Sequence, residues 1–372
     1  MKTYIEINSR NLLANLRFFK EKTQKKVMLV VKANAYGHGL KEVVEITRHC
    51  PYVDYYAVDT AEEALTIRRE GAQQPILVIG WADREELELI IRHGFETVVP
   101  SIEHFRTAGE LARKIGRTCR IHLKVETGAA RLGMEPASII KFLKGVSQNN
   151  LEIGGVYSHF ANIEDTTQHA YARQQLHTFN QFLKKVGQRR WLKHFSCSAS
   201  TLLFPETQFD MVRIGISAYG YWPSKQTYVS YLEKNGAAVR LRPVLNWYTK
   251  VAQVKTLDKG AFVGYGLTYR TYSKAKIVII PVGYYDGYDR RLSNMANVII
   301  RGCLAPVRGR ICMNMFMSEV THIKGIRVGD RVTLIGGERK DTIDAEQLAD
   351  VMGTINYEVL ARINPGIPRF IV

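Results

Sequence analysis

The chain has 372 residues, of which 46% are hydrophobic and 23% are charged, and it carries a formal net charge of +17. This length and composition allow two domains with hydrophobic cores and exclude a largely disordered chain. No apolar run reaches the ~18–20 residues that a membrane span needs, and no apolar signal core opens the chain, so we expect a cytoplasmic protein without a membrane partner.

The positive charge raises nucleic acid as a possible partner, because clustered Lys and Arg side chains bind phosphate backbones. The densest basic runs, KEKTQKK and GQRRWLKH, lie in polar connections, and no zinc-finger, RNP-like or helix-turn-helix pattern is present. We interpret these runs as solvated surface that attracts anionic metabolites, and we expect no nucleic acid partner. The five cysteines are scattered without metal-ligand spacing, so we expect reduced thiols and no metal site.

Eight short apolar runs alternate with segments of helical periodicity in the first part of the chain. The runs are KVMLVV (26–31), DYYAV (54–58), QPILVIG (74–80), FETVVP (95–100), RIHLKV (120–125), IGGVYSHF (153–160), KHFSCS (193–198) and MVRIGI (211–216). The clearest amphipathic segments cover 40–50, 61–70, 84–94 and 102–116. A strand followed by a helix, repeated eight times, predicts an α/β fold with a parallel (β/α)8 barrel over residues 1–230.

From about residue 231 the pattern changes to strands joined by glycine-rich turns. Candidate strands lie within 245–257, 274–288, 296–302, 305–320 and 330–337, and one late helix is indicated at 342–353. We therefore predict a mostly β second domain over residues 231–372, with which the first few residues of the chain could pair.

Polar and titratable residues follow the predicted barrel strands at their carboxyl ends, where barrel enzymes carry their active sites. These residues are Lys32, Lys124, Arg131, His159, Ser198 and Arg213. Each of them alone would more often be a rim or core residue, but their convergence on one mouth predicts a ligand site. A lysine among apolar neighbours has a lowered pKa and attacks carbonyls, as a Schiff base with pyridoxal phosphate requires. The turn after Gly215 offers backbone N–H groups for a phosphate, whereas no Walker motif favours a nucleotide.

The segment VVKANAYGHG (30–39) resembles the pyridoxal-phosphate lysine motif of bacterial alanine racemases, and the resemblance extends over essentially the whole chain. Further matching segments, in the family's order, are LKVETGAARLGM, YSHFANIED, MVRIGISAYG, VGYGLTYRT, PVGYYDGYDRRLSN, GRICMNMFM and INYEVLARINPGIPR. The resemblance implies a barrel with a C-terminal β domain, paired into a homodimer with shared active sites. It also implies a pyridoxal-phosphate isomerase that interconverts L-alanine and D-alanine and supplies D-alanine for peptidoglycan.

Residue roles follow from the resemblance. Lys32 would bond the cofactor and act as one base, and Tyr265 would act as the opposite base from across the dimer interface. The implied cofactor contacts are Lys32, Tyr36, His159, Ser198, Arg213, Gly215, Ile216 and Tyr357. Arg213 would donate to the pyridine nitrogen, keep it unprotonated and so favour racemisation over transamination. A tyrosine base needs a lowered pKa, so we expect a cation or hydrogen-bond donor beside Tyr265.

The substrate contacts are implied in the same way. Arg131 and the backbone N–H of Met313 would hold the substrate carboxylate. Lys124 would be carbamylated, which turns an ammonium into an anion that can pair with Arg131. Tyr284 and Arg290 would line the corridor by which substrate enters.

Three departures from the family pattern bear on the substrate contacts. Asn314 stands where the family usually has aspartate, Cys197 stands for an asparagine, and ETGAARLG stands for DTGMGRLG. Two alternatives remain: a racemase of broader specificity, for example for serine, and a non-catalytic pyridoxal-phosphate carrier. The long β domain and Tyr265 argue against the carrier, and the GYGLTY motif argues against a decarboxylase of the same fold.

Overall fold

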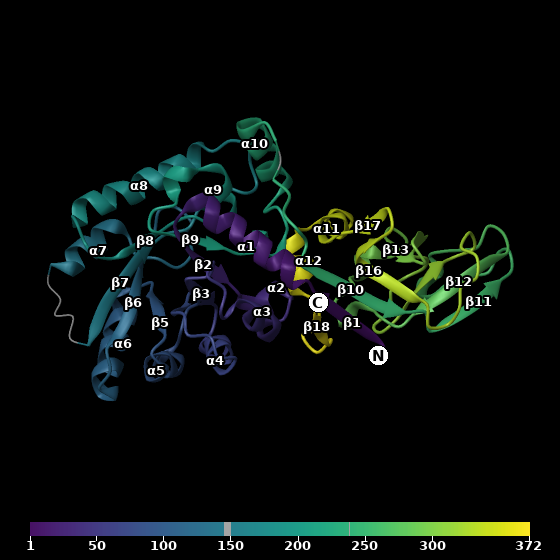
Figure 1. The fold of residues 1–372 in the computed structure, drawn as a ribbon, viewed down its shortest axis with the longest axis horizontal. Coiled ribbons are helices and arrows are strands. Elements are labelled where there is room, and N and C mark those ends of the chain that lie inside the picture. Colours follow the sequence, from purple (N-terminus) through teal and green to yellow (C-terminus); the bar gives the residue numbers. More distant parts are fainter. Residues whose placement is uncertain (145–149, 238) are drawn as a thin grey trace. The chain divides into compact units, whose positions relative to one another are not determined.

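The computed structural model describes residues 1–144, 150–237 and 239–372. These residues form two compact units (Figure 1). One unit contains residues 10–35 and 43–243, and the other contains residues 1–9, 36–42 and 244–372. Within the described ranges, no helix combines the length and the apolar character needed to cross a membrane.

A ring of eight parallel strands forms the centre of the first unit. The strands are β2 (Lys26–Val30), β3 (Tyr55–Val58), β4 (Ile76–Val78), β5 (Glu96–Val99), β6 (Cys119–Lys124), β7 (Leu151–Tyr157), β8 (Leu192–His194) and β9 (Met211–Ile214). They pair in the order β8-β7-β6-β5-β4-β3-β2-β9. The two end strands are joined by bonds from the Asp210 and Arg213 N–H groups to the carbonyls of Lys193 and Ser196, both 3.0 Å, so the barrel is nearly closed. All eight predicted strands are confirmed.

Helices surround these strands, as Figure 1 shows for α4 to α8. The helices of the chain's first part are α1 (Ser9–Thr23), α3 (Leu40–Thr47), α4 (Ala61–Arg69), α5 (Arg84–His93), α6 (Ile102–Ile115), α7 (Pro136–Leu143), α8 (Ala170–Val186), α9 (Ser198–Leu203) and α10 (Lys225–Asn235). The four predicted amphipathic segments are confirmed as α3 to α6.

The helix α5 illustrates how local sequence sets these boundaries. The Asp83 side chain accepts a hydrogen bond from the Glu86 N–H (2.8 Å) at the start of the helix. Gly94 ends it with a left-handed backbone at φ 68°. Leu87 and Ile90 are buried along one face, so capping and amphipathic periodicity specify the same element.

The second unit consists mainly of two sheets. Its strands are β1 (Thr3–Ile7), β10 (Leu245–Lys250), β11 (Gln253–Leu257), β12 (Ala275–Ile280), β13 (Asn297–Ile300), β14 (Cys303–Pro306), β15 (Phe316–Glu319), β16 (Arg331–Glu338), β17 (Asp341–Ile343) and β18 (Arg369–Ile371). One sheet has the order β14-β13-β16-β10-β1-β18, with β17 beside β16, and the other has the order β11-β12-β15. The first strand, β1, runs antiparallel to β10 and parallel to β18.

Two helices complete this unit. The predicted late helix is α11 (Ala345–Met352). A second helix, α12 (Asn356–Ala361), was missed because six residues are too few for a clear helical period.

Candidate active site

Lys32 opens a turn whose backbone is left-handed. In this turn, α2 (Lys32–Tyr36), Ala33 has φ 54° and ψ 53°, Asn34 has φ 54° and ψ 46°, and Ala35 has φ 53° and ψ 51°. Tyr36 continues it at φ 53°. A left-handed conformation costs a residue with a Cβ atom roughly 1–2 kcal/mol. Strain of this kind concentrates at functional sites, and here it follows the lysine predicted to react.

The Lys32 side chain is not held among apolar groups, so that expectation is wrong for the single chain. The side chain is 41% exposed, and its Nζ lies 3.9 Å from Oδ1 of Asp59. The apolar residues that precede Lys32 in the sequence form the buried strand β2, whereas Lys32 itself leaves the barrel at the strand's carboxyl end. Asp59 follows β3, which pairs with β2, so the two charges emerge side by side.

Arg213 is a buried hub of hydrogen bonds. Its Nη1 donates to the His194 carbonyl (3.0 Å) and Nδ1 (3.0 Å). Its Nη2 donates to the carbonyls of Ser158 (2.8 Å) and Phe195 (3.1 Å) and to Nδ1 of His159 (3.2 Å). Burial of the rings and the Arg213 charge hold the pKa of His159 and of His194 well below the usual range. Both imidazoles are therefore neutral acceptors toward a fixed cation.

Lys124 ends β6 beside this hub. Burial, reinforced by the charges of Arg131 and Arg213, lowers the pKa of Lys124 to about 8. The Tyr157 ring lies 5.6 Å from the Lys124 Nζ and 5.3 Å from the Arg213 guanidinium, measured from the ring centroid. The same ring stacks on His194, with 4.8 Å between the centroids. The Tyr157 ring thus lies close to both cationic groups at the mouth, Lys124 and Arg213.

A hollow of about 250 Å³ adjoins these groups. Its lining includes Ala129, Arg131, His159, Ala161 and Glu164. Arg131 is exposed there and available to a ligand carboxylate. Of the predicted mouth residues, Arg131 and His159 line this hollow, and Arg213 and Lys124 lie beside them.

The loop that carries Arg131 is held by Glu126. The Glu126 carboxylate accepts hydrogen bonds from the N–H groups of Gly128 and Ala129, the latter at 2.7 Å. Burial alone would raise the pKa of Glu126, but these backbone donors lower it. Ala130, which stands where the family pattern has glycine, has φ 51°. The segment ETGAARLG, which differs from the family's DTGMGRLG, thus keeps the loop capped by Glu126. It also places a strained alanine directly before Arg131.

The other predicted cofactor contacts form one group in each unit. In the barrel unit, the Gly215 N–H donates to the buried Ser198 hydroxyl (3.1 Å), and Ile216 follows Gly215 in a short 3-10 turn. In the second unit, the rings of Tyr36 and Tyr357 lie 6.0 Å apart.

Cys197 precedes Ser198 and serves the structure of the α9 start. Its N–H donates to the Ser200 hydroxyl (2.9 Å), and its carbonyl accepts from the Thr201 hydroxyl (2.7 Å). Burial, with the Glu164 charge, raises the pKa of the Cys197 thiol to about 11. The thiol is therefore protonated and unreactive at neutral pH.

The remaining predicted residues lie on four connected loops of the second unit, which we call the rim (265–268, 284–285, 290–294 and 309–315). Asn294 donates to the Thr268 hydroxyl (3.1 Å) and accepts from the Gly309 N–H (2.6 Å). The Tyr284 N–H donates to the Cys312 carbonyl (3.1 Å). These bonds order the rim without help from another chain.

Tyr265, Tyr284, Arg290 and Met313 are all exposed on the rim. Tyr265 is 71% exposed and Met313 is 54% exposed. A Cβ atom added at Gly266 would lie 3.0 Å from the Arg310 guanidinium carbon, so a cation packs against the residue next to Tyr265. Asn314 is exposed in the same loop as Met313.

Several buried polar residues were missed in the sequence, namely Glu96, His122, Tyr157 and His194. The available signal is their position inside predicted barrel strands. His122 lies two residues before Lys124, so both point to the same face of β6. A polar residue on that face of a barrel strand is therefore a candidate site residue, as one at the strand end is.

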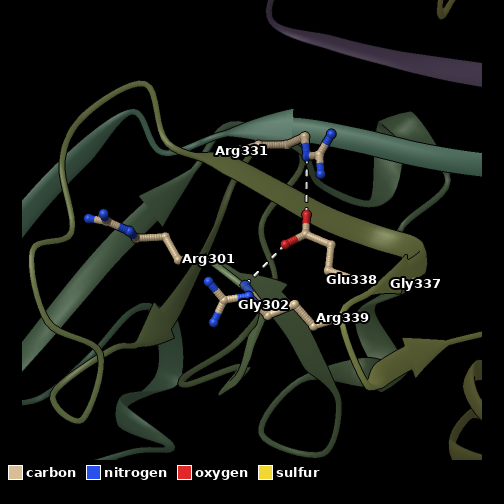
Figure 2. A pocket seen from close by; sticks show the side chains of 6 residues that line it. All are labelled: Arg301, Gly302, Arg331, Gly337, Glu338 and Arg339. Carbon is tan, nitrogen blue, oxygen red and sulfur yellow. Dashed lines mark hydrogen bonds and ion pairs between the residues drawn. The ribbon is translucent and has the colours of Figure 1, made fainter.

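A separate pocket of about 540 Å³ lies on the second unit (Figure 2). It is lined by Arg301, Gly302, Arg331, Gly337, Glu338 and Arg339. The Glu338 carboxylate accepts from the Arg331 Nε (3.1 Å) and the Gly302 N–H (3.0 Å), as Figure 2 shows. None of the predicted site residues lines this pocket.

Comparison with known proteins gives two family matches. The profile "Alanine racemase, N-terminal domain" matches residues 7–223, and "Alanine racemase, C-terminal domain" matches residues 244–371. A curated alanine racemase from Leptospira interrogans serovar Lai is 37% identical over 379 residues, covering 100% of this chain and 96% of the relative.

Solved structures agree with these matches. An alanine racemase from Clostridium difficile 630 superposes with a TM-score of 0.92 at 32% identity, covering 100% of this chain and 96% of the other. The alanine racemase from Bartonella henselae with covalently bound pyridoxal phosphate superposes with a TM-score of 0.87 at 25% identity, covering 100% of both chains.

The strained alanine before Arg131 gives a direct test of the loop geometry. Because Ala130 has a left-handed backbone, Ala130→Gly should relieve about 1 kcal/mol of strain and leave stability unchanged or higher. Ala129→Gly, at the neighbouring position without positive φ, should lose roughly 0.5–1 kcal/mol. Thermal unfolding of both variants at one protein concentration measures the difference. Equal losses of stability in the two variants would contradict the left-handed backbone at Ala130.

Proposed function

Because this chain belongs to the alanine racemase family, we propose that it interconverts L-alanine and D-alanine with pyridoxal phosphate as its cofactor. One observation carries the proposal. Lys32 follows β2 and Arg213 lies in β9, and these two strands are hydrogen-bonded neighbours, with Met28 opposite Arg213. A reactive amine and a fixed cation therefore share the mouth of a barrel that alanine racemases match over its full length.

The residues of the mouth fit pyridoxal phosphate. The hydrogen bonds among the described residues engage both terminal nitrogens of Arg213 and leave its Nε–H for a ring nitrogen. Lys32 would hold the cofactor covalently through Nζ, as the covalently bound group of the Bartonella relative supports. We assign its phosphate to Ser198, Gly215 and Ile216 with Tyr36 and Tyr357, a set that supplies hydroxyl and backbone N–H donors.

When bound, pyridoxal phosphate withdraws electrons from Cα of the amino acid and makes its proton acidic. Racemisation then needs a base on each face of Cα. We assign Tyr265 Oη to the proton of L-alanine and Lys32 Nζ to the proton of D-alanine, so that each is the acid when the other is the base. General acid–base help of this kind is worth about 10²–10⁴-fold.

The other mouth and rim residues would orient the substrate. The Arg131 guanidinium and the Met313 N–H would hold the alanine carboxylate, and Tyr284 and Arg290 would line the access corridor. Arg213 can donate but cannot readily give up its proton, so it would keep the ring nitrogen unprotonated and favour return of the proton to Cα.

A homodimer would complete this site. The rim exposes Tyr265, Tyr285 and Met313 at 71%, 65% and 54%. Large side chains exposed together at a catalytic residue favour a partner surface, and a second copy of this chain would bring Tyr265 to the other copy's barrel. All five cysteines are free thiols, which supports a reducing cytoplasm. There D-alanine would serve peptidoglycan synthesis.

The substrate is tested by incubating the holoenzyme with L-alanine, L-serine, L-ornithine or L-lysine and scoring the D-product by chiral separation. L-alanine should lead, with serine slower, since the curated relatives of this chain are alanine racemases. Lys32→Ala should abolish turnover and the borohydride-fixed adduct, whereas Lys141→Ala, on the exposed face of α7, should keep both. Equal rates for cationic side chains would exclude an alanine racemase.

The two bases are separated by following Cα proton exchange into deuterated water from each enantiomer. Tyr265→Phe should reduce exchange from L-alanine by at least 10²-fold, while exchange from D-alanine persists through Lys32. Tyr272→Phe, an exposed tyrosine outside the rim, serves as the control. Equal loss from both enantiomers, with cofactor bound and the dimer intact, would leave Tyr265 a positioning residue.

We also propose that Lys124 is carbamylated. The neutral amine adds CO₂ and releases one proton, so formation depends on the deprotonated fraction, which is about half at pH 8 and small at pH 6 because the Lys124 pKa is lowered to about 8. At fixed dissolved ¹³CO₂, a carbamate ¹³C signal should grow across this pH range. The signal should vanish in Lys124→Gln and persist in Lys141→Gln. A signal unaffected by Lys124→Gln would assign the carbamate elsewhere.

A further inference from the structure

A continuous line of three hydrogen bonds runs from Arg213 into the barrel. The Arg213 Nη1 lies 3.0 Å from His194 Nδ1, and His194 Nε2 lies 2.8 Å from His122 Nδ1. His122 Nε2 lies 2.7 Å from Oε2 of Glu96. All four side chains are buried. They come from β9, β8, β6 and β5, so the line crosses the interior of the barrel.

The ends of this line fix the direction of every bond in it. Arg213 can only donate, so His194 Nδ1 must accept, and His194 carries its proton on Nε2. That proton is donated to His122 Nδ1, which leaves the His122 proton on Nε2. The Glu96 carboxylate then accepts it. Arg213 and Glu96 are thus opposite charges joined through two neutral rings.

The reverse arrangement fails at Arg213. A proton on His122 Nδ1 would require His194 Nε2 to accept and would place the His194 proton on Nδ1. Two donors, this N–H and the Arg213 N–H, would then face each other at 3.0 Å without an acceptor. Buried donors without acceptors are costly, so only the first arrangement, with Glu96 as the last acceptor, satisfies every bond of the line.

The surroundings of the line are built to hold it. A Cβ atom at Gly155 would lie 2.3 Å from His122 Nδ1, so only glycine leaves room for the ring. Arg120 Nε lies 3.7 Å from Oε1 of Glu96 and 3.6 Å from Oε1 of Glu152. Glu96 is therefore paired on both oxygens, as a buried carboxylate must be.

We propose that Glu96 and His122 are positioning residues that lock His194 in its Nε2–H tautomer and thereby hold Arg213 with Nε aimed at the cofactor ring. The catalytic consequence rests on the proposed function. The proton order itself does not, because it concerns this chain without cofactor.

The proton order is read by long-range ¹H–¹⁵N correlation of ¹⁵N-histidine protein at pH 7.5 without cofactor. Signals are assigned with His122→Asn and His194→Asn. Both rings should show the Nε2–H tautomer. An Nδ1–H signal for either ring in the unsubstituted protein would overturn the inference.

Variants then test the role of Glu96. Glu96→Leu leaves the buried His122 Nε2–H without an acceptor, so the His122 ring should leave the line and lose its fixed Nε2–H pattern. Glu96→Gln can still accept through Oε1 and should keep it. Glu152→Leu, which removes the other carboxylate beside Arg120, is the matched control and should match the unsubstituted protein. Unchanged tautomers in a folded Glu96→Leu would overturn the positioning role.

Kinetics of the holoenzyme give the second readout. Glu96→Leu should lower kcat for alanine at least tenfold and leave KM within about twofold, because the Arg131 contact to the carboxylate is untouched. Glu96→Gln should recover most of kcat. If the protein shows the predicted tautomers but has no racemase activity, the proposed function is refuted and the proton order still holds.

Discussion

A buried guanidinium is the constraint on which the barrel interior depends. Taking the Arg213 charge out of water costs several kcal/mol unless hydrogen bonds and opposite charge offset the loss. The chain meets this cost with carbonyls at the ends of β7 and β8 and with imidazole nitrogens of His159 and His194. These partners come from the ends of β7 and β8, whereas Arg213 lies in β9, so the cation can be satisfied only after these three strands have come together.

This arrangement also sets the electrostatics of the mouth. Burial, reinforced by this fixed cation, keeps two histidines neutral and, with the charge of Arg131, lowers the Lys124 pKa to about 8. The same field leaves a mouth that attracts anions, which suits a substrate carboxylate and a cofactor phosphate. The Lys32 turn adds a second constraint of another kind, since its left-handed residues store conformational strain directly after the lysine that is predicted to react.

The β unit contributes order rather than burial to its predicted site residues. Hydrogen bonds join the rim loops that carry Tyr265 and Met313, while both side chains stay exposed. Ordered loops with an uncovered Tyr265 suit the proposed site shared between two chains, because little conformational entropy of the loops remains to be lost when a partner covers them.

The sequence by itself determined the eight barrel strands, four of their helices and the mouth residues at the strand ends, because periodicity and strand-end position are local properties. The resemblance to alanine racemases implied the roles of these mouth residues. Only the tertiary structure decided the surroundings of Lys32 and the line from Arg213 to Glu96. Lys32 follows an apolar run but lies beside Asp59, and Glu96 and His122 lie 26 residues apart yet share a hydrogen bond. Burial and partner choice arise from strands that are distant in sequence, and a local pattern contains neither.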